Sequence, residues 1–297
     1  MIDQQTQTIV ITGGTGGIGF QSALGLAKTG ARILIVGRNK KRGEEAVRLI
    51  INATNNQDVT FIKGDISSLA NIDKLADDIR IKTKQINVLV NNAGYLGSHH
   101  AQNEDGIEMH FAVNVLAPWH LTKALLPELQ SAKNSRVINV SGGDKPARID
   151  PDNLQAEKGF KGLMTYTHSK SIMEGMSMIL AEELKPLGIT VNVVFPGRAS
   201  TVMTQTLSLK ALPGAMKLMY PLFRLLFKED GGKSANKAAQ STIWSATSPE
   251  LVGVTGTYFD TNSVQKSLHP TAYEPKIQAQ IRTILDDAKV SATLTKS

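Results

Sequence analysis

Tyr166 and Lys170 are separated by four positions in the stretch YTHSK (166–170). In a helix this spacing places a phenol and an ammonium group on the same face, one turn apart. A nearby positive charge favours the phenolate and lowers the pKa of a tyrosine. A phenol tuned in this way can give a proton to a reacting oxygen or take one from it. The alternative is an ordinary polar pair on a helix, and only the surrounding motifs separate the two interpretations.

A glycine-rich stretch, TGGTGGIG (12–19), indicates a second kind of chemistry. It follows the apolar run TIVIT (8–12) and precedes a helical pattern. Glycine lets the backbone approach a phosphate closely, and the N-terminus of the following helix attracts its negative charge. The spacing is related to the dinucleotide fingerprint, although a flexible turn is the alternative. The residues expected to contact the cofactor here are Gly13, Thr15, Gly16, Gly17, Ile18 and Gly19.

The loop after the second apolar run, RILIVG (32–37), indicates which dinucleotide would bind. The next residues are RNKKR (38–42), which contain no acidic side chain. An acidic residue at this place binds the ribose 2′-OH of NAD, whereas an arginine accommodates the 2′-phosphate of NADP. We therefore predict NADP(H) over NAD(H), with Arg38 as the main contact and Lys41 or Arg42 as helpers. A solvated cationic helix start is the alternative.

The elements that must position these residues alternate along the chain. Apolar runs predict strands at 8–12, 32–37, 59–65, 86–94, 136–141, 189–197 and 256–260. Helical patterns lie between them, at 17–29, 40–54, 68–84, 105–131 and 165–187. This alternation predicts an α/β fold: a Rossmann-type doubly wound parallel sheet of about seven strands with helices on both faces. We expect a single NAD(P)-binding domain over residues 1–297, with a flexible tail at 286–297.

The composition excludes several other classes of function. The chain has 297 residues and no cysteine, so disulfides, thiolate zinc sites and cysteine nucleophiles are absent. Six scattered histidines lack metal-ligand spacing, and Ser141 in NVSGG is not part of a hydrolase G-x-S-x-G motif. The net charge of +7 comes from scattered residues, which argues against a nucleic-acid partner. Without a signal peptide or transmembrane segment, the expected location is cytoplasmic, and no metal is expected.

Seven short motifs occur in order along the chain. They are TGGTGGIG (12–19), GDIS (64–67), NNAG (91–94), FAVNVLAPWHLT (111–122), RVINVS (136–141), YTHSK (166–170) and FPG (195–197). In this order and at these spacings, the chain resembles the short-chain dehydrogenase/reductase family over about residues 7–260. The stretch GRNKKRGEEA (37–46), together with YTHSK, resembles the family's retinol-dehydrogenase-like, carbonyl-reductase-like branch.

The resemblance implies roles for the remaining cofactor-binding residues. Asp65 would bind the adenine amino group with Ile66 beside the ring, while Asn92, Ala93 and Gly94 would line the ribose side. Residues implied to lie against the nicotinamide are Pro196, Gly197, Ala199 and Thr201. Other interpretations of these motifs are a helix cap at Asp65 and a strand-ending turn at NNAG.

The resemblance also implies the catalytic roles. Tyr166 would donate a proton to a carbonyl oxygen or take it back, and Lys170 would also bind the nicotinamide ribose. Asn114 would hold a water that links Lys170 to solvent, unless it is a buried structural amide. The family's serine after the fifth strand aligns with Gly142, which leaves Ser141 as the best hydroxyl available. The alternative is that Tyr166 and a water orient the carbonyl alone.

Residues 198–235 would cover the substrate, by resemblance. They contain the apolar stretch LSLKALPGAMKLMYPLFRLLF (207–227), which predicts a roomy, lipophilic pocket. The stretch has two alternative uses: burial against the domain or another subunit, and contact with a membrane surface. His99 and His100 are candidates for substrate contact, whereas His168 is expected to face solvent or neighbouring side chains. Family members form dimers or tetramers through helices equivalent to 105–131 and 165–187, so we expect a homodimer or homotetramer.

The leading interpretation is an NADP(H)-dependent oxidoreductase that transfers hydride between nicotinamide and a lipophilic ketone, aldehyde or secondary alcohol. The first alternative is a non-catalytic NADP-binding sensor or interaction protein, because Gly142 occupies the serine position. A second alternative keeps the enzyme class and reverses the direction, giving an alcohol, steroid or retinoid dehydrogenase.

Overall fold

The central element is an eight-stranded sheet with the order β3-β2-β1-β4-β5-β6-β7-β8. The computed structural model describes residues 7–142, 146–205, 209–212, 214–226 and 228–294. The strands are β1 Thr8–Thr12, β2 Arg32–Gly37, β3 Val59–Lys63, β4 Val88–Asn91, β5 Arg136–Val140, β6 Thr190–Val194, β7 Thr257–Phe259 and β8 Gln265–Lys266. The seven predicted strands are confirmed and all parallel, whereas β8 is an antiparallel addition of two exposed residues.

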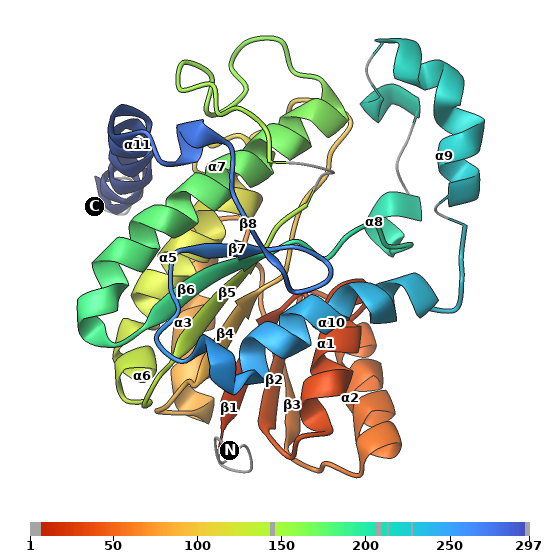
Figure 1. The fold of residues 1–297 in the computed structure, drawn as a ribbon, viewed down its shortest axis with the longest axis vertical. Helices are drawn as coiled ribbons and strands as arrows, with labels where there is room; N and C mark the ends of the chain where they lie inside the picture. Colours follow the sequence, from red (N-terminus) through yellow and green to blue (C-terminus); the bar gives the residue numbers. More distant parts are fainter. Residues whose placement is uncertain (1–6, 143–145, 206–208, 213, 227, 295–297) are drawn as a thin grey trace.

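Helices cover both faces of the sheet, as predicted (Figure 1). They are α1 Gly17–Ala27, α2 Lys40–Thr54, α3 Leu69–Lys82, α4 Met109–Phe111, α5 Ala117–Ala124, α6 Leu126–Gln130, α7 Gly162–Leu184, α8 Val202–Gln205, α9 Tyr220–Leu226, α10 Lys233–Thr247 and α11 Pro275–Leu294. One face carries α1, α2 and α10, and the other carries α3, α5 and α7. The doubly wound arrangement places the crossover point between β1 and β4.

The strands are apolar along their whole length because both of their faces are buried. In β1, Ile9 and Ile11 pack in the core beneath α1 and α2. Val10, between them, packs in the core beneath α3 and α7. Strands β1, β4 and β5 are parallel neighbours in register. Their carboxyl ends therefore lie at the same edge of the sheet.

The helix predicted at 105–131 is broken into short pieces. A five-residue π-helical turn, η1 (Ala112–Leu116), joins α4 to α5. Pro118 lacks the N–H that an α-helix would donate to the carbonyl of Asn114, which accounts for a local departure from α geometry. The irregular turn contains Asn114, which the sequence assigns to the site.

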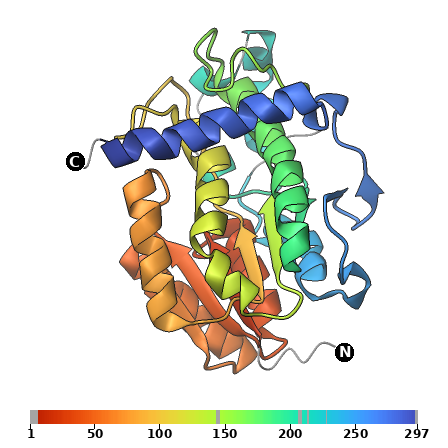
Figure 2. The same cartoon turned by 90° about the vertical axis from the view of Figure 1, so that its left-hand side faces the viewer.

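Helix α11 lies across the face formed by α3, α5 and α7 (Figure 2). Ile277, Ile281 and Leu285 recur every four residues and are buried in the main core. This apolar stripe docks the helix, which continues to Leu294. The flexibility predicted from residue 286 onward stays a prediction. Residues 295–297 lie outside the described residues.

An ion pair connects α11 to α7, and a second one connects α5 to the same residue of α7. Arg282 and Lys123 both pair with Glu183 on α7, and Lys123 lies 4.6 Å from the centroid of the Trp119 ring. Helix α11 thus packs on α7 and reaches the edge of α5 through Arg282, on part of the surface that was predicted to form a subunit interface.

Candidate active site

The glycine-rich turn connects β1 to α1 at the crossover point of the sheet, where doubly wound folds bind ligands. Gly13 and Gly17 have φ angles of 67° and 54°, which disfavour any other residue. A Cβ on Gly19 would lie 2.4 Å from the carbonyl oxygen of Gly13. Asn92 braces the same turn, since its Nδ2 donates to the carbonyl of Thr12 at 2.9 Å. The turn is therefore a closely packed cradle rather than a loose loop.

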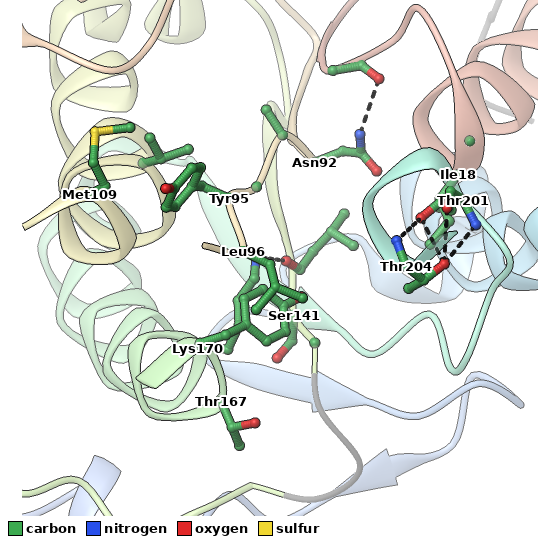
Figure 3. Close-up of a pocket in the computed structure, with 18 of the residues that line it drawn as sticks. Ile18, Asn92, Tyr95, Leu96, Met109, Ser141, Thr167, Lys170, Thr201 and Thr204 are labelled. Carbon is green, nitrogen blue, oxygen red and sulfur yellow. Dashed lines mark hydrogen bonds between the residues drawn. The ribbon is translucent and has the colours of Figure 1, made fainter. Parts of the chain in front are cut away.

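A cavity of about 1320 Å³ extends from this turn to the N-terminal half of α7. Apart from Lys41, the residues predicted to bind the cofactor line it, and so do Tyr166, Lys170 and Ser141. Figure 3 shows Ser141 and Lys170 in the middle of the site, with Ile18, Thr201 and Thr204 to one side. The structure thus brings together residues from the ends of β1, β2, β4, β5 and β6.

Two guanidinium groups line the end of the cavity next to β2. Arg38 follows β2 directly, and Arg42 lies on the first turn of α2. Asn39 caps this helix by accepting the N–H of Arg42 at 3.0 Å. The Arg42 side chain reaches the glycine turn, because a Cβ on Gly16 would lie 2.8 Å from its Nη2. These cations and the glycine cradle fit a dinucleotide carrying an extra phosphate, whereas Lys41 does not line the cavity.

The two remaining adenosine-side motifs both border the cavity. Asp65 lines it and is not a helix cap, because the N-cap of α3 is Ser68; its Oδ1 accepts the N–H of Ser67 at 3.0 Å in the turn before that helix. In the NNAG motif, the N–H groups of Asn92 and Ala93 both donate to Thr12 Oγ1 at 3.1 Å. Each motif therefore closes a strand and also faces the cavity.

Tyr166 is buried at the carboxyl end of β5, beside Gly142. A Cβ placed on Gly142 would lie 2.1 Å from Tyr166 Oη, so the phenol occupies the space next to the glycine. Burial raises the pKa of Tyr166 to about 12. The sequence predicted a lowering of this pKa by Lys170; in this structure the pKa is raised instead, and desolvation of the buried phenol is the cause.

Lys170 lies one turn further along α7 and is also buried. Its Nζ donates to the carbonyl of Val140 at 2.9 Å, which directs the ammonium at the end of β5. Burial lowers the pKa of Lys170 to about 8. The ammonium therefore loses its proton at a lower pH than that of an exposed lysine.

Ser141 does not present a free hydroxyl to the cavity. Its Oγ donates to Oε1 of Glu174 at 2.5 Å, and both side chains are buried. Glu174 was not predicted from the sequence. Its spacing of four residues from Lys170, inside the otherwise uncharged stretch SIMEGMSMIL (171–180), was the signal that could have identified it.

The Asn114 side chain does not line the cavity and holds the loop after β4. Its Oδ1 accepts the N–H of Tyr95 at 2.8 Å, and its Nδ2 donates to the Tyr95 carbonyl and to Ser169 Oγ. The side chain is thus a buried amide with protein partners for its oxygen and its nitrogen. Its predicted role in holding a water for Lys170 stays a prediction.

None of the three histidines considered from the sequence presents a reacting group to the substrate side of the cavity. His168 Nε2 accepts the N–H of Asp150 at 2.9 Å, which ties α7 to the preceding loop, although the ring borders the cavity. His99 and His100 are exposed and do not line the cavity. His100 makes an edge contact with the Phe160 ring at 5.8 Å.

The substrate side of the cavity is built differently from the prediction. Its apolar lining comes from the loop after β4, from α4 with η1, and from α7: Tyr95, Leu96, Met109, Val113, Leu163 and Met164. In the segment 198–235, Thr201 and Thr204 line the cavity, but no described residue from 209 onward does. Residues 206–208, 213 and 227 of the predicted apolar cover lie outside the described residues.

The cover segment is nevertheless anchored beside the cavity. Ala211 and Leu212 are buried against Leu96 and Leu163, both of which line it. The approach is close, since a Cβ on Gly162 would lie 2.4 Å from the carbonyl oxygen of Ala211. Further along, four leucines are exposed: Leu209, Leu218, Leu222 and Leu225.

Among the described residues, no helix has the length and apolar character needed to cross a bilayer. Within the same residues, no three His, Cys, Asp or Glu side chains are grouped as a metal site.

Comparison with known proteins agrees with this architecture. The family model described as short chain dehydrogenase matches residues 7–211. Retinol dehydrogenase 13 of Homo sapiens is 32% identical over 277 residues, covering 93% of this chain and 82% of that protein. Polyprenol dehydrogenase of Homo sapiens is 32% identical over 280 residues, covering 92% and 82%.

Solved structures share the fold. An uncharacterized protein from Mycobacterium Paratuberculosis has a TM-score of 0.71 at 21% identity, covering 95% of this chain and 92% of that one. The Pseudomonas aeruginosa RhlG/NADP active-site complex has a TM-score of 0.63 at 25% identity, covering 88% and 97%. This chain therefore belongs to the short chain dehydrogenase family, in its retinol-dehydrogenase-like branch, whose members are oxidoreductases of alcohol and carbonyl groups.

Proposed function

We propose that this protein is an NADP(H)-dependent reductase of lipophilic ketones and aldehydes, acting reversibly on the matching alcohols. The observation that carries the proposal is the placement of Tyr166. Its buried phenol lines one cavity with Lys170, the glycine-rich turn and Arg38. A phenol in this place can donate a proton to a carbonyl oxygen during reduction.

The bound nicotinamide supplies the hydride, and the chain supplies the proton and the orientation. Tyr166 Oη donates its proton to the carbonyl oxygen as that oxygen gains negative charge. The Lys170 ammonium, held by Val140, stabilises the phenolate that is left behind. Because position 142 is a glycine and Ser141 donates to Glu174, the carbonyl is oriented by Tyr166 and water.

The preference for NADP(H) rests on Arg38 and Arg42. Both line the cavity next to β2, and the loop 38–42 that carries Arg38 contains no acidic residue to repel a 2′-phosphate. A relative that covers most of this chain is named as an NADP complex. Arg38 is proposed as the main contact and Arg42, which reaches Gly16, as its helper.

The substrate class is inferred from the apolar part of the cavity. Leu96, Met109, Val113 and Leu163 offer a surface for a hydrocarbon group, and Met109 can adapt to its shape. Relatives are named for retinol and polyprenol, both long apolar alcohols. Residues 198–235, anchored at Ala211 and Leu212, are proposed to cover the bound substrate.

We propose that the predicted homo-oligomer forms through a surface other than the helices at 105–131 and 165–187. Helix α11 covers the outer surface of α7 and, through Arg282, the edge of α5. A dimer of this chain must therefore use another face, and light scattering on the purified protein tests whether it forms. The cytoplasmic location stays a prediction from the sequence.

Consumption of NADPH in the presence of aromatic and long-chain aliphatic ketones tests the proposal. We expect carbonyl-dependent oxidation of NADPH by the purified protein. A specific observation, the glycine at position 142, favours a second candidate: a protein that binds NADP(H) without turnover. Tight NADPH binding with no consumption across the ketone panel would support that sensor and overturn the reductase.

A further inference from the structure

We propose that Glu174, held by Ser141, is a positioning residue that keeps the Lys170 ammonium charged. This inference rests on the proposed function, because it concerns the roles given there to Tyr166 and Lys170. It also gives Ser141 a different task from the one expected from the sequence, since the hydroxyl acts on a carboxylate behind the site.

The three side chains lie in a row along α7. Tyr166, Lys170 and Glu174 are spaced by four residues, so they share one face of the helix. Glu174 is 3% exposed and does not line the cavity, so it touches neither substrate nor cofactor. Lys170, one turn away on the same helix and lining the cavity, is the group through which its charge acts in this proposal.

A buried carboxylate needs partners, and Ser141 is the closest one. Its Oγ, at the end of β5, donates to Glu174 Oε1 at 2.5 Å, a length typical of hydrogen bonds to a carboxylate. The serine is itself 4% exposed, so this bond is shielded from water. Loss of the bond would leave a charge without its donor in a dry place.

The charged and titratable groups around Glu174 come from two elements. Lys170 on α7 attracts the carboxylate. On the other side, Tyr258 of β7 has its pKa raised by burial and by the charges of Glu174 and Asp260. Tyr258 on β7 and Asp260, which follows that strand, are not cations. The cation that Glu174 stabilises is therefore Lys170.

The pKa shifts of Glu174 and Lys170 agree with this arrangement. Burial raises the pKa of Glu174 to about 7, while Ser141 and Lys170 oppose that rise. Burial lowers the pKa of Lys170 to about 8, and Glu174 opposes that fall. Removal of the carboxylate charge would therefore lower the pKa of Lys170 further, and the ammonium beside Tyr166 would be lost at a lower pH.

The main test is the pH profile of kcat/KM for ketone reduction in the variant Glu174→Gln. Glutamine has the same shape and can still accept the Ser141 hydrogen, but it carries no charge. We expect the alkaline limb to move toward acid by about one pH unit, a loss of about tenfold on that limb. Activity on the acidic side should be unchanged, and Glu174→Asp should restore part of the shift.

The matched control is Glu182→Gln, the same substitution at an exposed position of the same helix. It should leave the profile where it is. If Glu174→Gln lowers activity equally at every pH, or leaves the profile unmoved, the proposal is overturned, since a purely structural residue would act in this way.

A second test needs no turnover. A glutamate whose folded pKa lies above its unfolded value destabilises the fold as pH rises through that interval. The Tm of the native protein should therefore fall, relative to that of Glu174→Gln, between about pH 5 and about pH 8. A constant difference in Tm over this range would show that the carboxyl group is not a buried, titrating one, and would overturn the proposal even if the protein reduces no ketone.

Ser141→Ala separates the role of the serine from that of the glutamate. Without the donor, the carboxylate is less stable, so the alkaline limb should shift in the same direction as in Glu174→Gln, but less far. Ser135→Ala is the control, because Ser135 is a buried serine next to the other end of β5 whose Oγ lacks a hydrogen-bond partner among the described residues. A profile for Ser141→Ala identical to that of the native protein would remove Ser141 from the proposal.

Discussion

Tyr166 and Gly142 are in direct contact at the carboxyl end of β5, where a Cβ on the glycine would lie 2.1 Å from the phenol oxygen. The family resemblance places a serine at this position, and the structure shows why one does not fit here. Tyr166 Oη occupies the volume that the side chain would need. The absence of a side chain at position 142 and the position of the phenol are therefore two aspects of one arrangement.

The first prediction follows from that contact. Gly142→Ala forces Tyr166 away from its place, because the methyl group and Oη cannot share the space. We expect kcat to fall by roughly 10²-fold with NADPH affinity preserved, since positioning errors of about 1 Å carry losses of this size. Steady-state kinetics and NADPH titration measure the two effects.

Gly142→Ser gives a sharper form of the same prediction. Although it supplies the hydroxyl that the family uses, it should lower kcat as Gly142→Ala does, because the displaced tyrosine is the more important group. A Gly142→Ser variant that is faster than the native protein would mean that Tyr166 moves freely and that the missing hydroxyl limits the rate.

The second prediction concerns cofactor choice. Arg38→Asp replaces a cation by an anion where the 2′-phosphate of NADPH would bind, so the phosphate loses a charged hydrogen bond and meets a repulsion. We expect the ratio of NADPH to NADH activity to fall by about tenfold to a hundredfold.

Arg48→Asp is the control for that experiment. Arg48 lies on α2 but pairs with Glu45 at 2.6 Å and does not line the cavity. This variant should keep the native ratio. If Arg38→Asp also keeps it, Arg38 does not read the 2′-phosphate and the assignment to NADP(H) loses its main support.

Much of the fold was predictable because its signals are local. Each strand is buried on both faces and so appears as a short apolar run, and the glycines at 13 and 17 mark a turn that needs positive φ angles. Helix α2 begins as predicted because Asn39 caps it, and it ends as predicted because Asn55 takes a left-handed conformation with a φ of 59°. Helix α11 was missed because its apolar stripe is sparse and its meaning depends on docking against α7.

The residues that make up the site were predictable from the sequence, but the shift in the pKa of Tyr166 and the pairing of Ser141 were not. The residues of the glycine turn, Arg38, Tyr166 and Lys170 were assigned to one site, and they line one cavity. The direction of the Tyr166 pKa was wrong, since burial is a property of the assembled fold. The pairing of Ser141 with Glu174 joins residues 33 positions apart, a contact that no local pattern encodes.

The third prediction concerns the docking of α11. Ile281 is fully buried and would contact a Cβ on Gly175 at 3.3 Å, so Ile281→Ala leaves a cavity between α11 and α7. We expect the free energy of unfolding to fall by about 2–5 kcal/mol, as measured by denaturant titration.

Ile81→Ala is the matched control, because Ile81 on α3 is 75% exposed. Its effect should stay within about 0.5 kcal/mol. Equal effects of the two substitutions would mean that α11 is not packed on the domain in solution, and the α5 and α7 surface would again be free for a partner subunit.

The most direct test of the central claim is NADPH consumption by Tyr166→Phe. The substitution removes one hydroxyl from a buried side chain and leaves the glycine turn and Arg38 untouched. The account predicts that the native protein oxidises NADPH when a lipophilic ketone is added, and that Tyr166→Phe binds NADPH equally well but loses turnover. Turnover by Tyr166→Phe at the native rate would contradict the claim that this phenol is the proton donor.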